Sequence, residues 1–485
     1  DPRTRDLLRV GWLAARAHLD EPAARGDVDG VRAPGRTAST CKYDERPAVQ
    51  PAWSGMTTTE PHDSASGGIE PLRRSTRVPE SHCRWMLLEE ASDADQETWR
   101  EDIRALLGQH PRATLDHDPD WLELRAAESR RRAFLYVGVD KAGQLVGYAP
   151  FLAHPSSLSF SLAGRSLLTL PVQRLAITAS PLLVDESSQF ASDAVHSLLT
   201  TLRKALTPGQ VLFVLGLHQD SVLGALAERR RSLGFLAMPH GPAYERRMAN
   251  VGSSLDAYLS ELGAKTRADL RRHERMLHRH VDGAVELMIA DATEHVVSLL
   301  DAVEAVSRRT YQWHLHGIGV TNSADTRSLL ERAALRGWLR GYVLKCRGQP
   351  VAFMIGYLYN GVYLSESIGY DPEWAHWSVG NVLHLHVMRD LAALGGRARW
   401  FDFLYGDNSN KRRLATRSHW ERNVYLVPDT LRWRCVVPML RGFDRATERL
   451  VALAERYKIK TRIQRMLRRR SVRGASPPSN RRDEA

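Results

Sequence analysis

A polar segment near residue 400 holds residues suited to acid–base and oxyanion chemistry. Residues 400–404 (WFDFL) read as a strand that carries Asp402, and the strand breaks at Gly406. Because a carboxylate in an apolar strand is costly unless it is paired, Asp402 could form a structural ion pair with Lys411 or Arg412. Alternatively, Asp402 would act as the base for an incoming amine or hydroxyl, and Lys411 would stabilise a thioester or ester oxyanion. The sequence leaves both interpretations open.

A second group of residues could hold an anion. Ser378, Val379, Gly380 and Asn381 stand where a helix over 381–394 is predicted to open. The free amides and the dipole at a helix N-terminus favour a phosphate or pyrophosphate. The alternative is that Ser378 is an ordinary N-cap.

A third group forms a positive stripe. The helix predicted over 253–280 carries the basic residues Lys265, Arg267, Arg271, Arg272 and Arg275. Arg267, Arg271 and Arg275 recur every four residues, so they share one face and could grip phosphates or a carboxylated sugar. The alternative is a solvated face, partly neutralised by Asp269 and Glu274.

Patterns typical of metal or covalent catalysis are missing from the sequence. His384 and His386 are two residues apart, so their rings point to different sides of the predicted helix, which argues against a shared metal. There is no H-E-x-x-H, no G-x-S-x-G and no phosphate-binding P-loop. The four cysteines lie far apart without a C-x-x-C pair, which favours a reducing, cytoplasmic setting. These absences argue against a metallohydrolase, a serine hydrolase and a nucleoside triphosphatase.

The charge is concentrated at one end of the chain. The 485 residues carry a net charge of +12, from 68 basic and 56 acidic residues. Residues 456–485 hold 11 Lys/Arg and 2 Asp/Glu, which gives +9 and leaves +3 for the rest. This tail could contact a polyanion, or it could simply be solvated. No apolar run approaches the length of a membrane span, and the oligomeric state is left open.

The pattern of elements around these groups predicts an α/β (α+β) chain in which one order of elements occurs twice. The predicted elements of the first half are helices over 95–108, 188–206 and 219–233, and strands over 133–138, 144–152, 166–170, 181–184 and 210–217. Those of the second half are helices over 253–280, 291–312, 325–339 and 381–394, strands over 284–290, 341–346, 351–359, 362–370, 400–404 and 421–427, and a basic helix over 437–470. Residues 142–150 (AGQLVGYAP) resemble 347–355 (RGQPVAFMI), which hints at an internal duplication.

The second half resembles the acetyltransferase domain of the CelD/BcsL type, a member of the GNAT superfamily of N-acyltransferases. The matching segments are YLSEL at 258–262, KTR at 265–267, LRR at 270–272, GQPVA at 348–352, GYDP at 369–372, SVG at 378–380, FDFLYG at 401–406 and KR at 411–412. The resemblance spans about 95–430, and the related FemAB-like peptidyltransferases carry two GNAT units in tandem. It therefore implies two tandem GNAT-like units, each with a mixed, mostly antiparallel sheet flanked by helices.

The resemblance also implies roles for individual residues. Acyl-CoA, such as acetyl-CoA, would bind through its pyrophosphate at Ser378, Val379, Gly380 and Asn381. Val379 stands where similar proteins have proline. The implied catalytic residues are Asp402 and Lys411, and the implied substrate-binding residues are Lys265, Arg267, Arg271, Tyr370 and Arg412.

The sequence predicts four segments. Residues 1–84 are expected to be disordered, 85–250 and 251–430 to form the two GNAT-like units, and 431–485 to form a helix and basic tail. The expected function is acyl transfer to an amine or hydroxyl of a sugar, a polysaccharide precursor or a small metabolite. The resemblance implies direct transfer, which needs no metal and no covalent enzyme intermediate. Two alternatives are a FemAB-like transferase that uses aminoacyl-tRNA and a catalytically inactive scaffold in a polysaccharide-synthesis complex.

Overall fold

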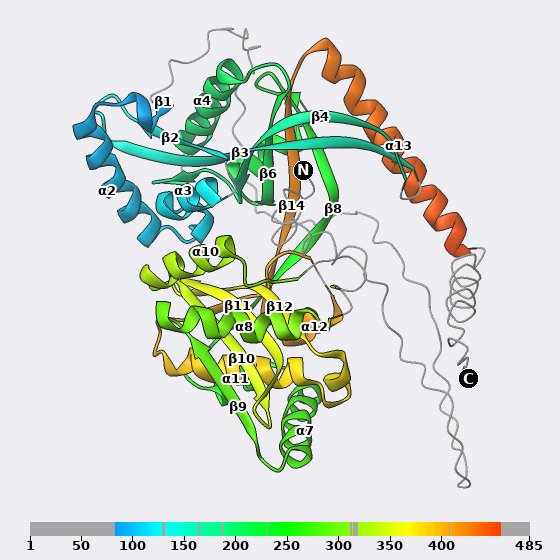
Figure 1. Cartoon of the computed structure of the whole chain (residues 1–485). Coiled ribbons are helices and arrows are strands. Elements are labelled where there is room, and N and C mark those ends of the chain that lie inside the picture. Colours follow the sequence, from blue (N-terminus) through cyan, green and yellow to red (C-terminus); the bar gives the residue numbers. More distant parts are fainter. Residues whose placement is uncertain are drawn as a thin grey trace, which may run out of the picture. The chain divides into compact units, whose positions relative to one another are not determined.

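The computed structural model describes residues 83–128, 131–162, 165–186, 189–229, 231–310, 313, 319–406 and 408–456 (Figure 1). The chain divides into a large compact part, residues 1–20 and 81–485, and a small one, residues 21–80. Every described residue belongs to the large part. The predictions for the N-terminal segment and for the basic tail therefore lie almost wholly outside the described residues. None of the described helices combines the length and the apolar character needed to cross a bilayer.

The first half contains eight strands and four α-helices among the described residues. The strands are β1 (Arg84–Leu87), β2 (Arg132–Val139), β3 (Leu145–Leu162), β4 (Arg165–Thr178), β5 (Leu182–Leu183), β6 (Gln210–His218), β7 (Arg231–Ser232) and β8 (Phe235–Asn250). The helices are α2 (Asp93–Gln109), α3 (Pro119–Glu128), α4 (Gln189–Ala205) and α5 (Val222–Glu228). The sequence-based prediction missed β8, because Pro239, Gly241 and Pro242 interrupt its alternation of apolar and polar residues.

The second half adds six strands. These are β9 (Val285–Ala290), β10 (Leu339–Cys346), β11 (Gln349–Tyr359), β12 (Val362–Tyr370), β13 (Trp400–Asp402) and β14 (Arg417–Pro428). The helices are α6 (Leu255–Glu261), α7 (Ala264–His280), α8 (Val296–Ser307), α10 (Ala324–Leu335), the 3-10 helix η5 (Pro372–Trp377), α11 (Val379–Ala393), α12 (Ser409–Leu414) and α13 (Leu431–Arg456). The single helix predicted over 253–280 is wrong, because the chain is extended at Leu262 and Gly263 between α6 and α7.

All the strands join one 14-stranded sheet. Its main path runs β1-β2-β3-β4-β6-β14-β8-β13-β12-β11-β10-β9. Neighbours on this path are antiparallel except for β4 with β6 and β12 with β13, which are parallel. In each parallel pair a helix lies between the two strands in the sequence, α4 in the first half and α11 in the second. The repeated order of elements is therefore present in the structure, although the two sheets are fused into one.

The halves interlock through an exchange of strands. Strand β14 belongs to the second half in sequence, yet it lies between β6 and β8. In turn, β8 from the first half pairs with β13 of the second. A boundary at 250/251 would thus separate strands that hydrogen-bond to each other. The division into four segments stays a prediction.

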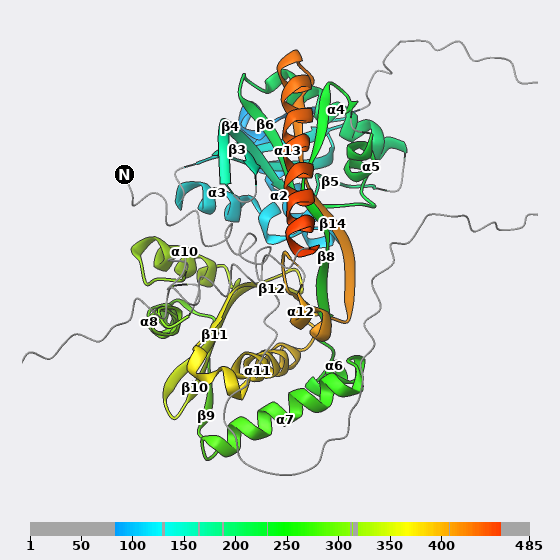
Figure 2. The same ribbon diagram turned by 90° about the vertical axis from the view of Figure 1, so that its right-hand side faces the viewer.

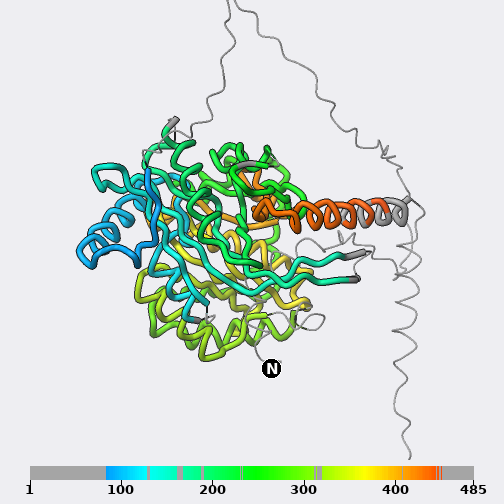
Figure 3. Tube along the Cα trace, turned by 90° about the horizontal axis from the view of Figure 1, so that it is seen from above, coloured from blue at the N-terminus to red at the C-terminus, as the bar shows by residue number. Residues whose placement is uncertain are grey.

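Helices cover both faces of the sheet. In the second half, α6, α7 and α11 pack on one face and α8 and α10 on the other (Figure 2). In the first half, α4 and α5 lie over one face, while α2 packs on the other. Helix α13 lies along the extended hairpin of β3 and β4, where Trp433 and Val437 meet Leu158 and Phe160 (Figure 3).

One aromatic side chain of the first half is embedded in the core of the second. Trp121 of α3 packs edge-on against Tyr357 and Trp338, with ring centroids 4.8 and 6.0 Å apart. Asp118 caps α3 by accepting the amides of residues 120 and 121, and it also accepts the Tyr359 hydroxyl at 2.9 Å. Together these contacts hold α3 against the second half of the sheet.

We expect Trp121→Ala to lower the free energy of unfolding by about 3–5 kcal/mol, because it removes a buried aromatic ring and leaves a cavity. Trp420→Ala is the matched control, since Trp420 is 50% exposed and Trp121 only 4%. The control should change stability by about 0.5 kcal/mol or less. Chemical denaturation of the three proteins measures this, and equal losses would contradict the anchoring role of Trp121.

Candidate active site

Strand β12 loses its parallel neighbour part-way along. It pairs with β13 only over residues 362–364, opposite 400–402. Residues 365–370 stay hydrogen-bonded to β11 on the other side. Among the residues that the structure describes, no strand pairs with this part of β12 on the β13 side. The edge therefore presents backbone N–H and C=O groups that an extended ligand can pair with.

The end of β13 creates this opening. Leu404 adopts a left-handed conformation with φ of +57°, which costs an ordinary residue about 1–2 kcal/mol. The Asp402 carboxylate stabilises the turn by accepting the Leu404 amide at 2.8 Å. The predicted strand 400–404 therefore ends two residues early, and the chain turns away from β12.

A buried ion pair fixes Asp402. The Arg246 guanidinium from β8 donates to both Asp402 oxygens, with Nη2 2.6 Å and Nε 2.9 Å from Oδ2. A third charge, Glu421 of β14, lies 3.5 Å from Arg246 Nη1. Burial alone would lower the pKa of Arg246, but the two carboxylates raise it well above its ordinary value. The expected pairing of Asp402 with Lys411 or Arg412 is corrected: its ionic partner is an arginine 156 positions earlier in the chain.

Lys411 holds the loop that follows β13. Its side chain is buried, and Nζ donates to the carbonyl oxygens of Tyr405 at 2.7 Å and Gly406 at 3.3 Å. Asn408 caps α12 by accepting the Lys411 amide. Arg412, the next residue, is exposed. The structure thus shows a structural contact for Lys411, and its catalytic role stays a prediction.

The residues predicted to bind a pyrophosphate lie beside the open end of β12. Ser378 ends η5 in a left-handed conformation with φ of +54°, and its side chain makes no capping hydrogen bond. The interpretation of Ser378 as an ordinary N-cap is therefore wrong. Val379 is fully buried, whereas Gly380 is exposed, and a Cβ on Gly380 would lie 3.8 Å from the Tyr370 ring. The structure brings Gly380 and Tyr370 together.

The basic stripe of α7 mainly holds α6. Arg267 Nη1 donates to the carbonyl oxygens of Ser260 and Leu262 at 3.0 and 3.1 Å, at the C-terminal end of α6. Arg271 pairs with Asp256 of α6 at 2.9 Å. Lys265 is exposed. Two of the three predicted substrate contacts on this helix therefore have partners within the fold.

Sequence reasoning missed Glu366. The register of β11 and β12 shifts there, because Ile355 lies opposite Ser367 and Gly356 lies opposite Ser365. Glu366 is thus the extra residue of a β-bulge, on the part of β12 whose edge is open. Burial raises the pKa of this carboxyl group; the charge of Arg125 lowers it and that of Asp116 raises it. The available signal was a lone carboxylate in an apolar strand, the same signal that marked Asp402.

The described residues of the first half show no equivalent opening. Strand β4 pairs with β6 from Gln173 to Thr178, where β4 ends. Its parallel partner therefore accompanies β4 to its last residue. The geometry that could admit an extended ligand next to a helix N-terminus is present in the second half only, as far as the described residues show.

Part of the chain matches a known protein family. Residues 264–412 match the acetyltransferase (GNAT) domain family. This range runs from the first residue of α7 into α12, so it includes β12, α11, Asp402 and Lys411. A search of curated proteins found no match.

Solved structures resemble the chain at low identity. FemX is 10% identical with a TM-score of 0.50, over 70% of this chain and 98% of FemX. The C-terminal domain of a putative lysylphosphatidylglycerol synthetase from Agrobacterium fabrum is 13% identical, with a TM-score of 0.42 over 71% and 96%. A tandem GNAT protein from the clavulanic acid biosynthesis pathway is 13% identical, with a TM-score of 0.40 over 72% and 99%.

The chain has a GNAT-type acyltransferase fold. Each of its two halves contains antiparallel strands and one parallel pair connected through a helix, which is the arrangement expected of two tandem GNAT-like units. The predicted fold class is confirmed. In the second GNAT-like unit, the open edge of β12 leads to the N-terminus of α11.

We expect Asp402→Asn to lower the free energy of unfolding by about 3 kcal/mol or more, because it leaves the buried Arg246 without its carboxylate. Asp256→Asn is the control, since it removes the exposed partner of Arg271 and should cost about 1 kcal/mol or less. Urea denaturation measures both. A loss as small as that of the control would show that the pair with Arg246 does not hold the end of β13.

Proposed function

We propose that this protein is an acyl-CoA-dependent acyltransferase whose donor site lies in the second GNAT-like unit. One observation carries the proposal: the edge of β12 is open from residue 365 to 370 and leads to the N-terminus of α11. An acyl-CoA has a pyrophosphate and an extended, amide-bearing arm that ends in a thioester. These two parts suit the two parts of the site.

The pyrophosphate is proposed to bind at the start of α11. The first-turn amides of a helix have no acceptor within the helix, and its dipole favours an anion. Gly380 has no side chain to block the approach of such a group, and Tyr370 flanks it. Left-handed backbone at a non-glycine residue often marks a functional constraint, and Ser378 has it where η5 turns into α11.

The arm is proposed to lie along the open edge of β12 as an added strand. Residues 365–370 span about 17 Å at roughly 3.3 Å per residue. With the pyrophosphate near Tyr370, the thioester end reaches the bulge at Glu366. The bulge would then position the reacting carbonyl beside a carboxylate.

Glu366 is proposed as the general base. Its raised pKa brings it closer to neutrality, where a base is most effective once ionised. It would take a proton from the attacking amine or hydroxyl as the acyl carbon–oxygen or carbon–nitrogen bond forms. The carbon–sulfur bond would then break, and the departing CoA thiolate would take this proton from Glu366 and leave as a thiol. Because Glu366 is influenced by Arg125 and Asp116 of the first half, we place the acceptor between the two units.

The other predicted site residues keep proposed roles. Asp402 is proposed to hold the site open through Arg246, and Lys411 to position the loop at residues 405–406 next to the reacting groups. Lys265 and Arg412 are exposed and are proposed to contact anionic parts of the substrates. Arg267 and Arg271 would act through α6.

The proposed acceptor is the one that the CelD/BcsL resemblance implies: an amine or hydroxyl of a sugar, a polysaccharide precursor or a small metabolite. The proposed setting is the reducing cytoplasm that the four scattered cysteines favour. The alternative donor is aminoacyl-tRNA, as in FemAB-like transferases, and the net charge of +9 in residues 456–485 favours it. Acetyl-CoA binding separates the two, and an inactive scaffold would turn over neither donor.

We expect Gly380→Glu to abolish binding of acetyl-CoA, because it places a carboxylate where the pyrophosphate would lie. Gly108→Glu in α2 is the matched control: it is also a helical glycine with open space around it and should bind as the unaltered protein does. Isothermal titration calorimetry with acetyl-CoA measures all three. Equal binding by both variants would place the donor elsewhere.

We expect Glu366→Gln to lower kcat by about 10²- to 10⁴-fold while acetyl-CoA still binds. The rate of the unaltered enzyme should fall as the pH drops through the raised pKa of Glu366, because the protonated carboxyl group cannot accept a proton. The variant should lack this acidic limb. Glu373→Gln, at an exposed carboxylate in η5, is the control. A retained acidic limb in Glu366→Gln would assign the base to another group.

A further inference from the structure

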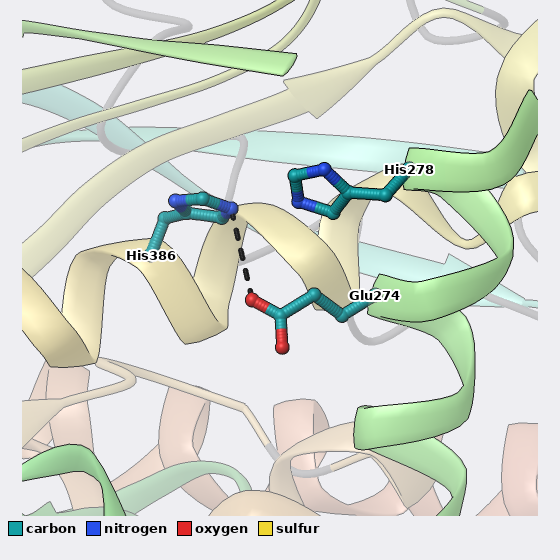
Figure 4. Close-up of side chains that lie close together, drawn as sticks. All are labelled: Glu274, His278 and His386. Carbon is teal, nitrogen blue, oxygen red and sulfur yellow. Dashed lines mark ion pairs between the residues drawn. The ribbon is translucent and has the colours of Figure 1, made fainter. Parts of the chain in front are cut away.

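Three potential metal ligands meet between α7 and α11. Glu274 and His278 lie four residues apart on one face of α7, and His386 faces them from α11 (Figure 4). One ligand atom from each lies within 4.8 Å of the others, and His386 Nε2 is 3.9 Å from Glu274 Oε1. The cluster is half-buried and lies in the contact between the two helices.

His386 has an unusual environment. Its Nε2 atom is buried and has no hydrogen-bond partner, whereas most buried polar atoms have one. His384, two residues earlier, points elsewhere and contacts the Tyr258 hydroxyl at 3.0 Å.

We propose that Glu274, His278 and His386 bind a divalent ion of the zinc class, with water completing the shell. Two imidazoles and one carboxylate are a donor set that zinc accepts in tetrahedral sites. Metal–ligand bonds of about 2.0–2.2 Å place tetrahedral ligand atoms about 3.4 Å apart. The ligand atoms now lie within 4.8 Å of one another, so side-chain rotations would have to bring them closer by at most about 1.4 Å.

The sequence-based expectation of no metal considered only ligands that lie close together in the sequence. The i, i+2 spacing of His384 and His386 does place their rings in different surroundings. This spacing does not predict the position of His278, which lies on a helix more than 100 residues earlier in the sequence. The proposed site is built by the packing of α7 on α11.

Arg389 competes with the metal for Glu274. Its Nη2 donates to Glu274 Oε1 at 2.9 Å, and its Nη1 lies 3.4 Å from His386 Nδ1. The Arg389 side chain is 47% exposed, so it can turn toward solvent when an ion binds. Removing the guanidinium should therefore strengthen metal binding.

The metal would brace the helix that begins at the proposed donor site. His386 is seven residues from the start of α11, which is about 10 Å along the helix axis. The C-terminal end of α7 also contacts η5, where His280 stacks on Trp377 at 3.9 Å. The ion would thus hold α7, η5 and α11 together without touching the donor, and the inference does not depend on the proposed reaction.

The test uses the full chain after treatment with EDTA and dialysis. Titration with Zn²⁺ should show binding of one equivalent that raises the thermal unfolding midpoint by about 2 °C or more. Co²⁺ should give the visible absorption of a tetrahedral site. His386→Gln should lose both signals, whereas His295→Gln, which removes a histidine 3.5 Å from Asp291, should keep them.

Arg389→Gln provides a test that misfolding cannot mimic. It should bind Zn²⁺ about two- to five-fold more tightly, since it removes an ion pair worth up to about 1 kcal/mol. The proposal is overturned if neither the unaltered protein nor Arg389→Gln binds Zn²⁺. It is also overturned if His386→Gln and Glu274→Gln bind as tightly as the unaltered protein.

Discussion

The bidentate pair between Arg246 and Asp402 is the constraint on which the site depends. It fixes the last residue of β13 against β8, and the same carboxylate stabilises the left-handed turn at Leu404. Because the chain turns away there, β12 continues without its parallel neighbour. A buried charge pair of this kind contributes little net stability by itself, yet breaking it is costly. Its effect here is to define where a strand ends.

The two units exchange strands and differ in the length of their parallel pairing. Strand β8 leaves the first unit to pair with β13, and β14 returns to lie between β6 and β8. In the first unit, β4 keeps its parallel partner up to Thr178. In the second, the partner stops at Asp402 while β12 runs on to Tyr370. Among the described residues, only the second unit therefore has an opening beside its parallel pair, and the first unit contributes α3, with Trp121, to the core of the second.

Local pattern predicted most of the elements, and long-range pairing accounts for what was missed at the site. Periodicity identified α2, α4 and α11 within a few residues, and Asn360 and Gly361 form the expected turn with positive φ at both positions. The partner of Asp402 could not be predicted, because Arg246 lies in a strand whose prolines and glycine hide its periodicity. Glu366 was missed for another reason: a bulge is a property of the register between two strands. The three ligands of the proposed metal site come from two separate helices, which spacing along one helix cannot reveal.

Hydrogen–deuterium exchange with and without acetyl-CoA tests the central claim most directly, because it reports on the backbone of β12 itself. Binding of the donor along the open edge should slow exchange of the amides in residues 365–370 and in residues 379–381 at the start of α11. Residues 173–178 of β4, the counterpart in the first unit, should exchange at an unchanged rate. Protection confined to the first unit, or no protection in β12 at a saturating concentration of acetyl-CoA, would contradict the account.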